Sequence, residues 1–195
     1  MKAYCINLDE RTDRWEQVQS QIELLGLKVE RFSAIKKKRG HDGCILSHIA
    51  LWDRLKDQDT FMIIEDDIKV RVDNPKEILN KAMSQLPDDW DMLYLGATLN
   101  QPPERISENL VRIKQAWTTH AIIYNNQNGV VDAILEEMDD FKVDVVLANS
   151  IQHKFKCFMT FPMICTQTEG FSNIINKHTT YQAITDRYDK YTKGI

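Results

Sequence analysis

The sequence predicts a single α/β domain built around a largely parallel central sheet. Short apolar runs typical of buried strands alternate with longer segments of helical periodicity, in the order β-α-β-α-β. A chain of 195 residues has the length of one compact domain, and no repeat or low-complexity linker divides it. Its 43% of hydrophobic and 28% of charged residues are ordinary globular values, so we expect a packed core.

A strand is expected first, over residues 3–8, ending in a polar loop. A helix should follow, because apolar residues recur at three- and four-residue spacing, namely Trp15, Val18, Ile22 and Leu25. We expect Asp13 to cap the start of this helix and Gly26 to end it. Residues 28–35 alternate well enough for a second strand.

The next apolar segments lead to an acidic cluster. Gly43 opens a helix-length segment over 44–55, and the run 61–64 follows as a strand buried on both faces. This run leads directly into three consecutive acids, Glu65, Asp66 and Asp67.

The rest of the chain continues the α/β alternation. A helix is expected over 75–86, starting at Pro75, and a buried strand over 92–95, ending at Gly96. The polar, proline-containing segment 101–109 predicts a loop over a site, where an acceptor could be recognised. Beyond it we expect strands over 110–113 and 120–124, helices over 130–138 and 143–153, and an extended segment over 158–168.

Charge and cysteine usage exclude some functions. A net charge of -4 gives no basic field for nucleic acid, so no nucleic-acid partner is predicted. The basic run Lys36-Lys37-Lys38-Arg39 is either a solvated loop or, beside an anionic ligand, a means of steering phosphates inward.

The four cysteines, Cys5, Cys44, Cys157 and Cys165, lack zinc-framework spacing and lie in apolar segments, as reduced structural thiols do. They predict a cytoplasmic location. The N-terminal apolar run is too short for a signal peptide, and no stretch could span a bilayer, although peripheral membrane contact stays open.

The acidic cluster is the strongest candidate site. Ligands of open α/β sheets bind beyond the carboxyl ends of strands, where Glu65, Asp66 and Asp67 are predicted to lie. Adjacent carboxylates repel one another, and a cation among them relieves that repulsion. Oxygen ligands beside a diphosphate suit Mg²⁺ or Mn²⁺. A merely solvated turn explains the spacing equally well, so both interpretations stay open here.

Several segments occur in a characteristic order: INLDERTDR over 6–14, GCILSHIALW over 43–52 and IEDD over 64–67. Downstream follow Asp91, Leu95-Gly96, Thr119-His120-Ala121, Asp144, Pro162, Gln167 and Ser172. This ordered set covers most of the chain and resembles glycosyltransferase family 25, which includes lipopolysaccharide galactosyltransferases and collagen galactosyltransferase domains. A lone Glu-Asp-Asp would be a weak signal.

The resemblance implies a GT-A-type fold, in which one Rossmann-like layer binds a nucleotide sugar, usually with a divalent metal. It implies transfer of galactose or a related hexose from a UDP-sugar or similar donor to a glycan or protein-linked acceptor, as in lipopolysaccharide biosynthesis. Where the family pattern suggests a glycine, this chain has Thr118. That departure leaves the donor sugar open.

Carried over residue by residue, the resemblance places Asn7, Leu8, Asp9 and Arg14 near the nucleotide. Glu65 would lie near the ribose and, with Asp67, at the metal, while Asp66 would face the donor sugar or the metal and act in catalysis. The residues themselves leave alternatives: Arg14 could instead pair with Asp13 or Glu10.

Ser47 could touch the donor or only bond locally within its helix. His48 fits a hydrogen-bonded core residue better than a ligand. His153 and His178 are candidate extra metal ligands, with a structural role favoured for each.

Asp144 lies among Val143, Val145 and Val146, where an acid is expected only as a helix cap or facing a cleft. The resemblance favours the cleft and the role of acceptor base. Direct displacement would then invert the anomeric configuration, with Asp67 kept ionised by metal and Asp144 free to take a proton.

Two other functions remain open. One is a non-catalytic nucleotide-sugar-binding or partner-binding module on the same fold, although all three acids are present. The other is a nucleotidyltransferase, which the lack of a Walker-type Gly-rich loop disfavours.

Overall fold

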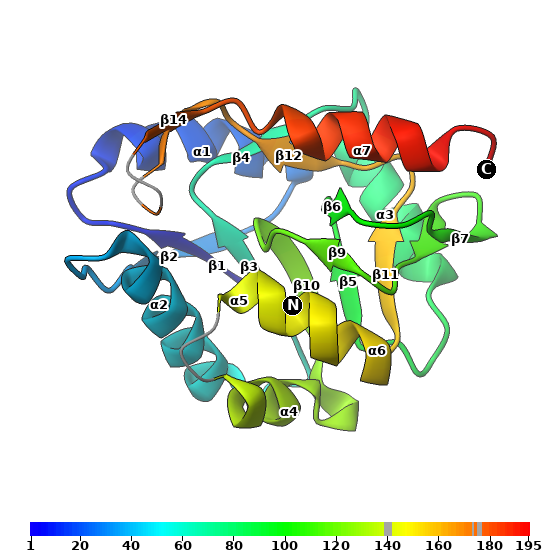
Figure 1. The fold of residues 1–195 in the computed structure, drawn as a ribbon, viewed down its shortest axis with the longest axis horizontal. Helices are drawn as coiled ribbons and strands as arrows, with labels where there is room; N and C mark the ends of the chain where they lie inside the picture. The colour runs from blue at the N-terminus through cyan, green and yellow to red at the C-terminus, as the bar shows by residue number, and fades with distance from the viewer. Residues whose placement is uncertain (139–141, 173, 175–176) are drawn as a thin grey trace.

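The computed structural model describes residues 1–138, 142–172, 174 and 177–195, and within them eight strands form the central sheet (Figure 1). Their order across the sheet is β2-β1-β3-β10-β5-β11-β8-β7. The strands are β1 (Lys2–Asn7), β2 (Val29–Ser33), β3 (Thr60–Glu65), β5 (Met92–Tyr94), β7 (Glu104–Ser107), β8 (Leu110–Arg112), β10 (Ala121–Asn125) and β11 (Cys157–Thr160). Six of them share one direction, and β10 and β8 run against it, so the predicted, mostly parallel sheet is confirmed.

Helices cover both faces of this sheet (Figure 1). Apolar residues of α1 (Thr12–Leu25) and α3 (Pro75–Gln85) join the core on one face. Those of α2 (Gly40–Leu55), α4 (Val130–Glu137), α5 (Val143–Val146) and α7 (Gln182–Thr192) join the core on the other. The predicted helix over 143–153 is one helical stretch, in which a π turn, η2 (Leu147–Ile151), separates α5 from α6 (Gln152–Lys154).

The apolar run in β3 is buried on both faces of the sheet. Phe61 and Ile63 pack in one core cluster, and Met62 and Ile64 in the other, because successive side chains of a strand point to opposite faces. All four are fully buried. The carboxyl end of β3, where Glu65 lies, therefore follows a segment that is packed on both faces of the sheet.

Two helix-start predictions are wrong, and close packing explains one of them. The helix α1 starts at Thr12, so Arg11 occupies the cap position and Asp13 lies in the first turn, paired with Arg11 at 2.8 Å. The helix α2 starts at Gly40, not after Gly43. A Cβ on Gly43 would lie 2.4 Å from the carbonyl oxygen of Ile35, so this position needs glycine for close approach of the preceding loop.

The predicted end of α1 is confirmed. Gly26 has φ 66, in the left-handed region, and its N–H donates to the carbonyl of Glu23 at 2.9 Å.

The segment 101–109 is not the predicted site loop. It contains β7, which pairs with β8 at the opposite edge of the sheet from β2. Smaller two-stranded sheets pair β4 (Ile68–Val70) with β12 (Cys165–Gln167), β6 (Thr98–Leu99) with β9 (Ala116–Trp117), and β13 (Gly170–Ser172) with β14 (Lys177–Thr179). A short 3₁₀ turn, η1 (Asn126–Asn128), precedes α4. Within the described residues, no helix combines the length and apolarity that crossing a membrane requires.

Candidate functional site

The acidic cluster lies beside the end of β1. Because β1 and β3 are parallel neighbours, with Ile6 opposite Glu65, the residues that follow the two strands meet. The amide of Asn7 donates to Asp66 Oδ2 at 2.7 Å, and Arg31 Nε donates to Asn7 Oδ1 at 2.8 Å. Asn7 is 1% exposed, so it acts as a buried connector between two strand ends.

Arg14, from the first turn of α1, binds two of the acids. Its Nη1 donates to Asp66 Oδ1 at 2.7 Å and lies 3.5 Å from Asp67 Oδ2. Its Nη2 donates to the carbonyl of Phe171 at 2.9 Å. Both oxygens of Asp66 are thus engaged, by Asn7 and Arg14, and the alternative pairing of Arg14 with Asp13 or Glu10 is not what the structure shows.

Glu65 faces a different set of neighbours. Thr119 Oγ1 donates to Glu65 Oε1 at 2.5 Å, and His48 Nε2 lies 3.5 Å from the same oxygen. The amide of Gln167 donates to Asp67 Oδ1 at 3.1 Å and reaches Glu65 Oε2 at 3.5 Å. The three acids therefore form a branched network rather than one patch.

This network separates the pKa values of the acids. Burial and the charge of Glu65 raise the pKa of Asp67 from 3.8 to about 7, and Arg14 offsets only part of that rise. Burial also raises the pKa of Glu65, but His48 and Thr119 outweigh it and hold that pKa below its usual value. At neutral pH the site combines an ionised Glu65 with an Asp67 whose charge is only partly compensated.

A cavity of about 290 Å³ opens over this network. Of the predicted donor-binding residues, Leu8, Arg14, Ser47 and Glu65 line it, together with Asp66 and Asp67. Asn7 lies behind it, as the partner of Asp66. Asp9 does not line it; its mostly exposed side chain pairs with Arg31 at 3.0 Å.

The basic run forms part of the wall of this cavity, through Lys36, Lys37 and Lys38. Ser47 holds the start of that loop: its hydroxyl accepts from Ile35 N–H at 2.8 Å and donates to the carbonyl of Gly43 at 2.7 Å. Ser47 thus bonds within its helix and to the start of the loop that carries the lysines.

A second cavity, of about 200 Å³, adjoins the first. The two share Cys44, Glu65, Ser172, Ile174 and Tyr181 as lining residues. His41, Lys142 and Asp144 line only the second. Asp144 is the second residue of α5 and Lys142 is its cap residue, so Asp144 does not occupy the cap position. Burial and the charge of Glu65 raise the pKa of Asp144.

The late histidines lie apart from both cavities. His153 and His178 are exposed, and neither lines these cavities. Three residues at the site had no role assigned from the sequence: Thr119, Gln167 and Tyr181. The first two belong to the family-like pattern, whereas no local signal marks Tyr181.

Thr118 occupies a backbone conformation that suits the glycine suggested by the family pattern. Thr118 has φ 72, in the left-handed region that glycine adopts without strain, and it lines the second cavity beside Thr119. A β-branched residue held there carries conformational strain.

We expect Thr118→Gly to be more stable than Thr118→Ala by about 1 kcal/mol, because both lose the hydroxyl and only glycine relieves the left-handed strain. Urea unfolding of the two variants measures the difference. Equal midpoints and slopes would show that φ at this position carries no strain.

The fold and the site define a class of protein. A mostly parallel central sheet with helices on both faces and acids at the end of a central strand is the architecture of the GT-A-like fold class. A solved structure of similar fold is the glycosyltransferase involved in glycosylation of the major capsid of PBCV-1, with a TM-score of 0.57, 7% identity and coverage of 98% of both chains.

Sequence comparison finds similarity to one glycosyltransferase family. Glycosyltransferase family 25 (LPS biosynthesis protein) matches residues 38–129. A glycosyltransferase 25 family member from Anopheles gambiae is 28% identical over an alignment of 160 positions that covers 62% of this chain and 26% of that protein. Human procollagen galactosyltransferase 2 is 28% identical over an alignment of 113 positions that covers 52% of this chain and 18% of that protein. The chain is thus similar to glycosyltransferase family 25 over nearly half of its length, and it spans about a quarter or less of the length of these relatives.

Proposed function

We propose that this chain transfers a hexose from a nucleotide sugar to an acceptor hydroxyl. The observation that carries the proposal is the pair of joined cavities: lysines, Arg14 and carboxylates line one, a separate carboxylate lines the other, and Glu65 and Tyr181 border both. Such a pair suits a donor and an acceptor that must meet at one bond. The family match, which covers the acidic cluster, supports the same reaction class.

The donor diphosphate belongs in the first cavity. Lys36 to Lys38 and Arg14 supply positive charge along its wall. Ser47 and Gly43 let the loop that carries these lysines pack closely against α2. UDP-hexose is the donor we propose. The galactosyltransferase name of the human relative supports galactose as the sugar.

The acids fit a divalent cation of the Mg²⁺ or Mn²⁺ type. Asp67 is buried, and among the described residues its Oδ2 has one charged contact, with Arg14 at 3.5 Å, so the negative charge on this oxygen is weakly compensated. Asp67 would hold the ion, with Glu65 Oε2 beside it through the shared Gln167 amide. When bound, the cation would stabilise negative charge on the leaving diphosphate. Asp66, with both oxygens engaged, would fix Arg14 against the donor.

Asp144 is the base in this proposal. The acceptor hydroxyl would enter the second cavity and attack the anomeric carbon as the bond to the diphosphate breaks, and Asp144 would take the hydroxyl proton. The raised pKa of Asp144 suits that task, because it makes the carboxylate a stronger base. A single displacement of this kind inverts the anomeric configuration.

The acceptor is proposed to be a glycan or a protein-linked sugar or side chain, in line with the lipopolysaccharide and procollagen names within the family. All four cysteines are free; Cys5, Cys157 and Cys165 are buried as predicted, whereas Cys44 is only partly buried. Free thiols support the proposed cytoplasmic location.

A thermal-shift panel of nucleotide sugars tests the donor assignment. We expect one UDP-hexose, in hundredfold excess over its Kd and with Mn²⁺ present, to stabilise the protein by about 2.7 kcal/mol, or roughly 5–10 °C in Tm. Chelator should remove the gain, and free hexose is the matched control. An equal shift with and without chelator would refute the metal role, and the absence of any shift across the panel would refute donor binding.

A further inference from the structure

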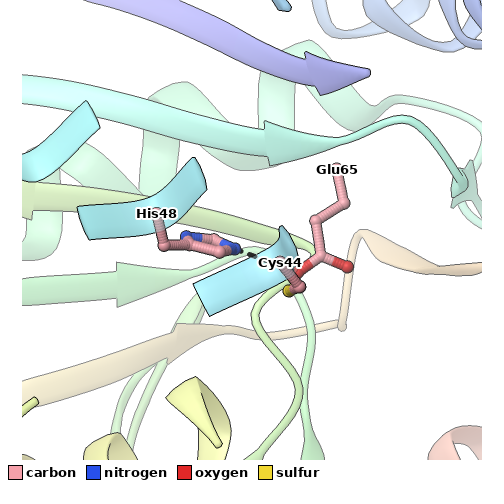
Figure 2. Close-up of side chains that lie close together, drawn as sticks. All are labelled: Cys44, His48 and Glu65. Carbon is pink, nitrogen blue, oxygen red and sulfur yellow. Dashed lines mark ion pairs between the residues drawn. The ribbon is translucent and has the colours of Figure 1, made fainter. Parts of the chain in front are cut away.

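A cysteine, a histidine and a glutamate lie close together (Figure 2), and all three line the first cavity. The sulfur of Cys44, a ring nitrogen of His48 and a carboxylate oxygen of Glu65 all lie within 4.8 Å of one another. Cys44 and His48 are one turn apart on α2, so they share a helix face, and Glu65 approaches them from the end of β3. Two rigid elements therefore present three potential ligands to one point.

The buried ring of His48 lacks hydrogen-bond partners among the described residues. It is 1% exposed, and neither ring nitrogen makes a hydrogen bond of good geometry with any described residue. Its Nε2 is aimed at Glu65 Oε1, 3.5 Å away. A buried polar atom without a partner is unfavourable, and a ligand that binds Nε2 would remove that deficit.

The distance between His48 Nε2 and Glu65 Oε1 is that expected between two ligands of one tetrahedral ion. Two ligands about 2.0–2.1 Å from a Zn²⁺ ion stand about 3.4 Å apart at the tetrahedral angle, close to the observed 3.5 Å between His48 Nε2 and Glu65 Oε1. Sulfur and imidazole nitrogen select Zn²⁺ over Mg²⁺ or Mn²⁺, which prefer oxygen. The ligand set therefore differs in kind from the carboxylate site at Asp67.

We propose that Cys44, His48 and Glu65 form a second metal site that binds Zn²⁺. Cys44 and Glu65 line both cavities and His48 lines the first, so a fourth ligand to the ion would come from cavity solvent or a bound molecule. The site joins α2 to the end of β3. Its existence does not depend on the glycosyl transfer proposed above.

Zinc titration of the metal-depleted protein against a chromophoric chelator tests the site. We expect one Zn²⁺ per chain, with an affinity reduced by at least about tenfold in Cys44→Ser and in His48→Gln. Cys157→Ser, which alters a buried thiol in β11, is the matched control and should bind as wild type. Melting of each variant without metal verifies that it is folded.

Cobalt provides a second readout that needs neither donor nor acceptor. Co²⁺ bound at the site should show a thiolate charge-transfer band and the strong visible bands of tetrahedral coordination, and Cys44→Ser should lose the thiolate band. Wild-type affinity in Cys44→Ser would show adventitious zinc only and overturn the proposal, as would Co²⁺ bound without a thiolate band. Failure of the donor panel, with zinc binding intact, would refute the transferase function alone.

Discussion

Asp144→Asn is expected to lower turnover by a factor of about 10²–10⁴ while donor binding and its metal dependence stay near wild type. Asp144 lines only the second cavity, whereas Lys36 to Lys38 and Arg14 line the first, so its loss leaves the proposed donor contacts in place and removes the group that would take the acceptor proton. Calorimetry gives donor affinity, and initial rates per folded molecule give turnover.

Asp132→Asn is the matched control, because Asp132 also lies in the first turn of a helix, α4, but is exposed. It should keep wild-type turnover. Full turnover in Asp144→Asn would remove Asp144 from the role of base. The pH profile of wild-type turnover gives a further test. Burial and Glu65 raise the pKa of Asp144, so turnover should fall, as the pH is lowered, at a pH above the pKa of an ordinary aspartate.

Asp67→Asn is expected to abolish metal-dependent donor binding and yet to stabilise the metal-free protein. The first effect follows from loss of a charged oxygen ligand at the cation. The second follows from the pKa of Asp67, which rises from 3.8 to about 7 on folding. Between these values the folded protein holds a proton that the unfolded chain has released, so the free energy of unfolding falls as pH rises across the window.

Above about pH 7 and without metal, Asp67→Asn should therefore exceed wild type by roughly 2–4 kcal/mol in unfolding free energy. Urea unfolding at pH 5 and pH 8 in chelator measures this, and the gain should shrink at the lower pH. Asp59→Asn, an exposed change just before β3, is the control. Retained metal-dependent donor binding would contradict the ligand role of Asp67, and equal stability at pH 8 would contradict its raised pKa.

Strand and helix positions were largely predictable because burial leaves local marks. The run 61–64 has no polar residue since both of its faces are packed, and Gly26 ends α1 through its left-handed backbone. Strand direction leaves no such mark. β10 is as apolar as β3, yet it runs antiparallel between β3 and β5, which only the sheet pairing reveals. Likewise, β7 is mostly exposed at a sheet edge, and its polar residues read as a loop.

The place of the candidate site was predictable, but its internal pairing was not. Acids after a buried strand mark the sheet edge where ligands bind. What each acid contacts depends on distant segments: Gln167 reaches Asp67 across 100 positions, and Arg14 reaches Asp66 across 52. Cys44 and His48 are close in sequence, one turn apart on α2. The third member of the cluster, Glu65, comes from the strand β3.

Release of nucleoside diphosphate from the donor that gives the largest thermal shift, followed in real time with Mn²⁺ and with water or a hexose as acceptor, tests sugar transfer itself. Wild type is expected to release the nucleoside diphosphate and to stop when chelator is added, Asp67→Asn to release almost none, and Asp144→Asn to bind the donor but release slowly. Donor binding by wild type without any release would contradict the transferase function and identify the chain as a non-catalytic nucleotide-sugar-binding module.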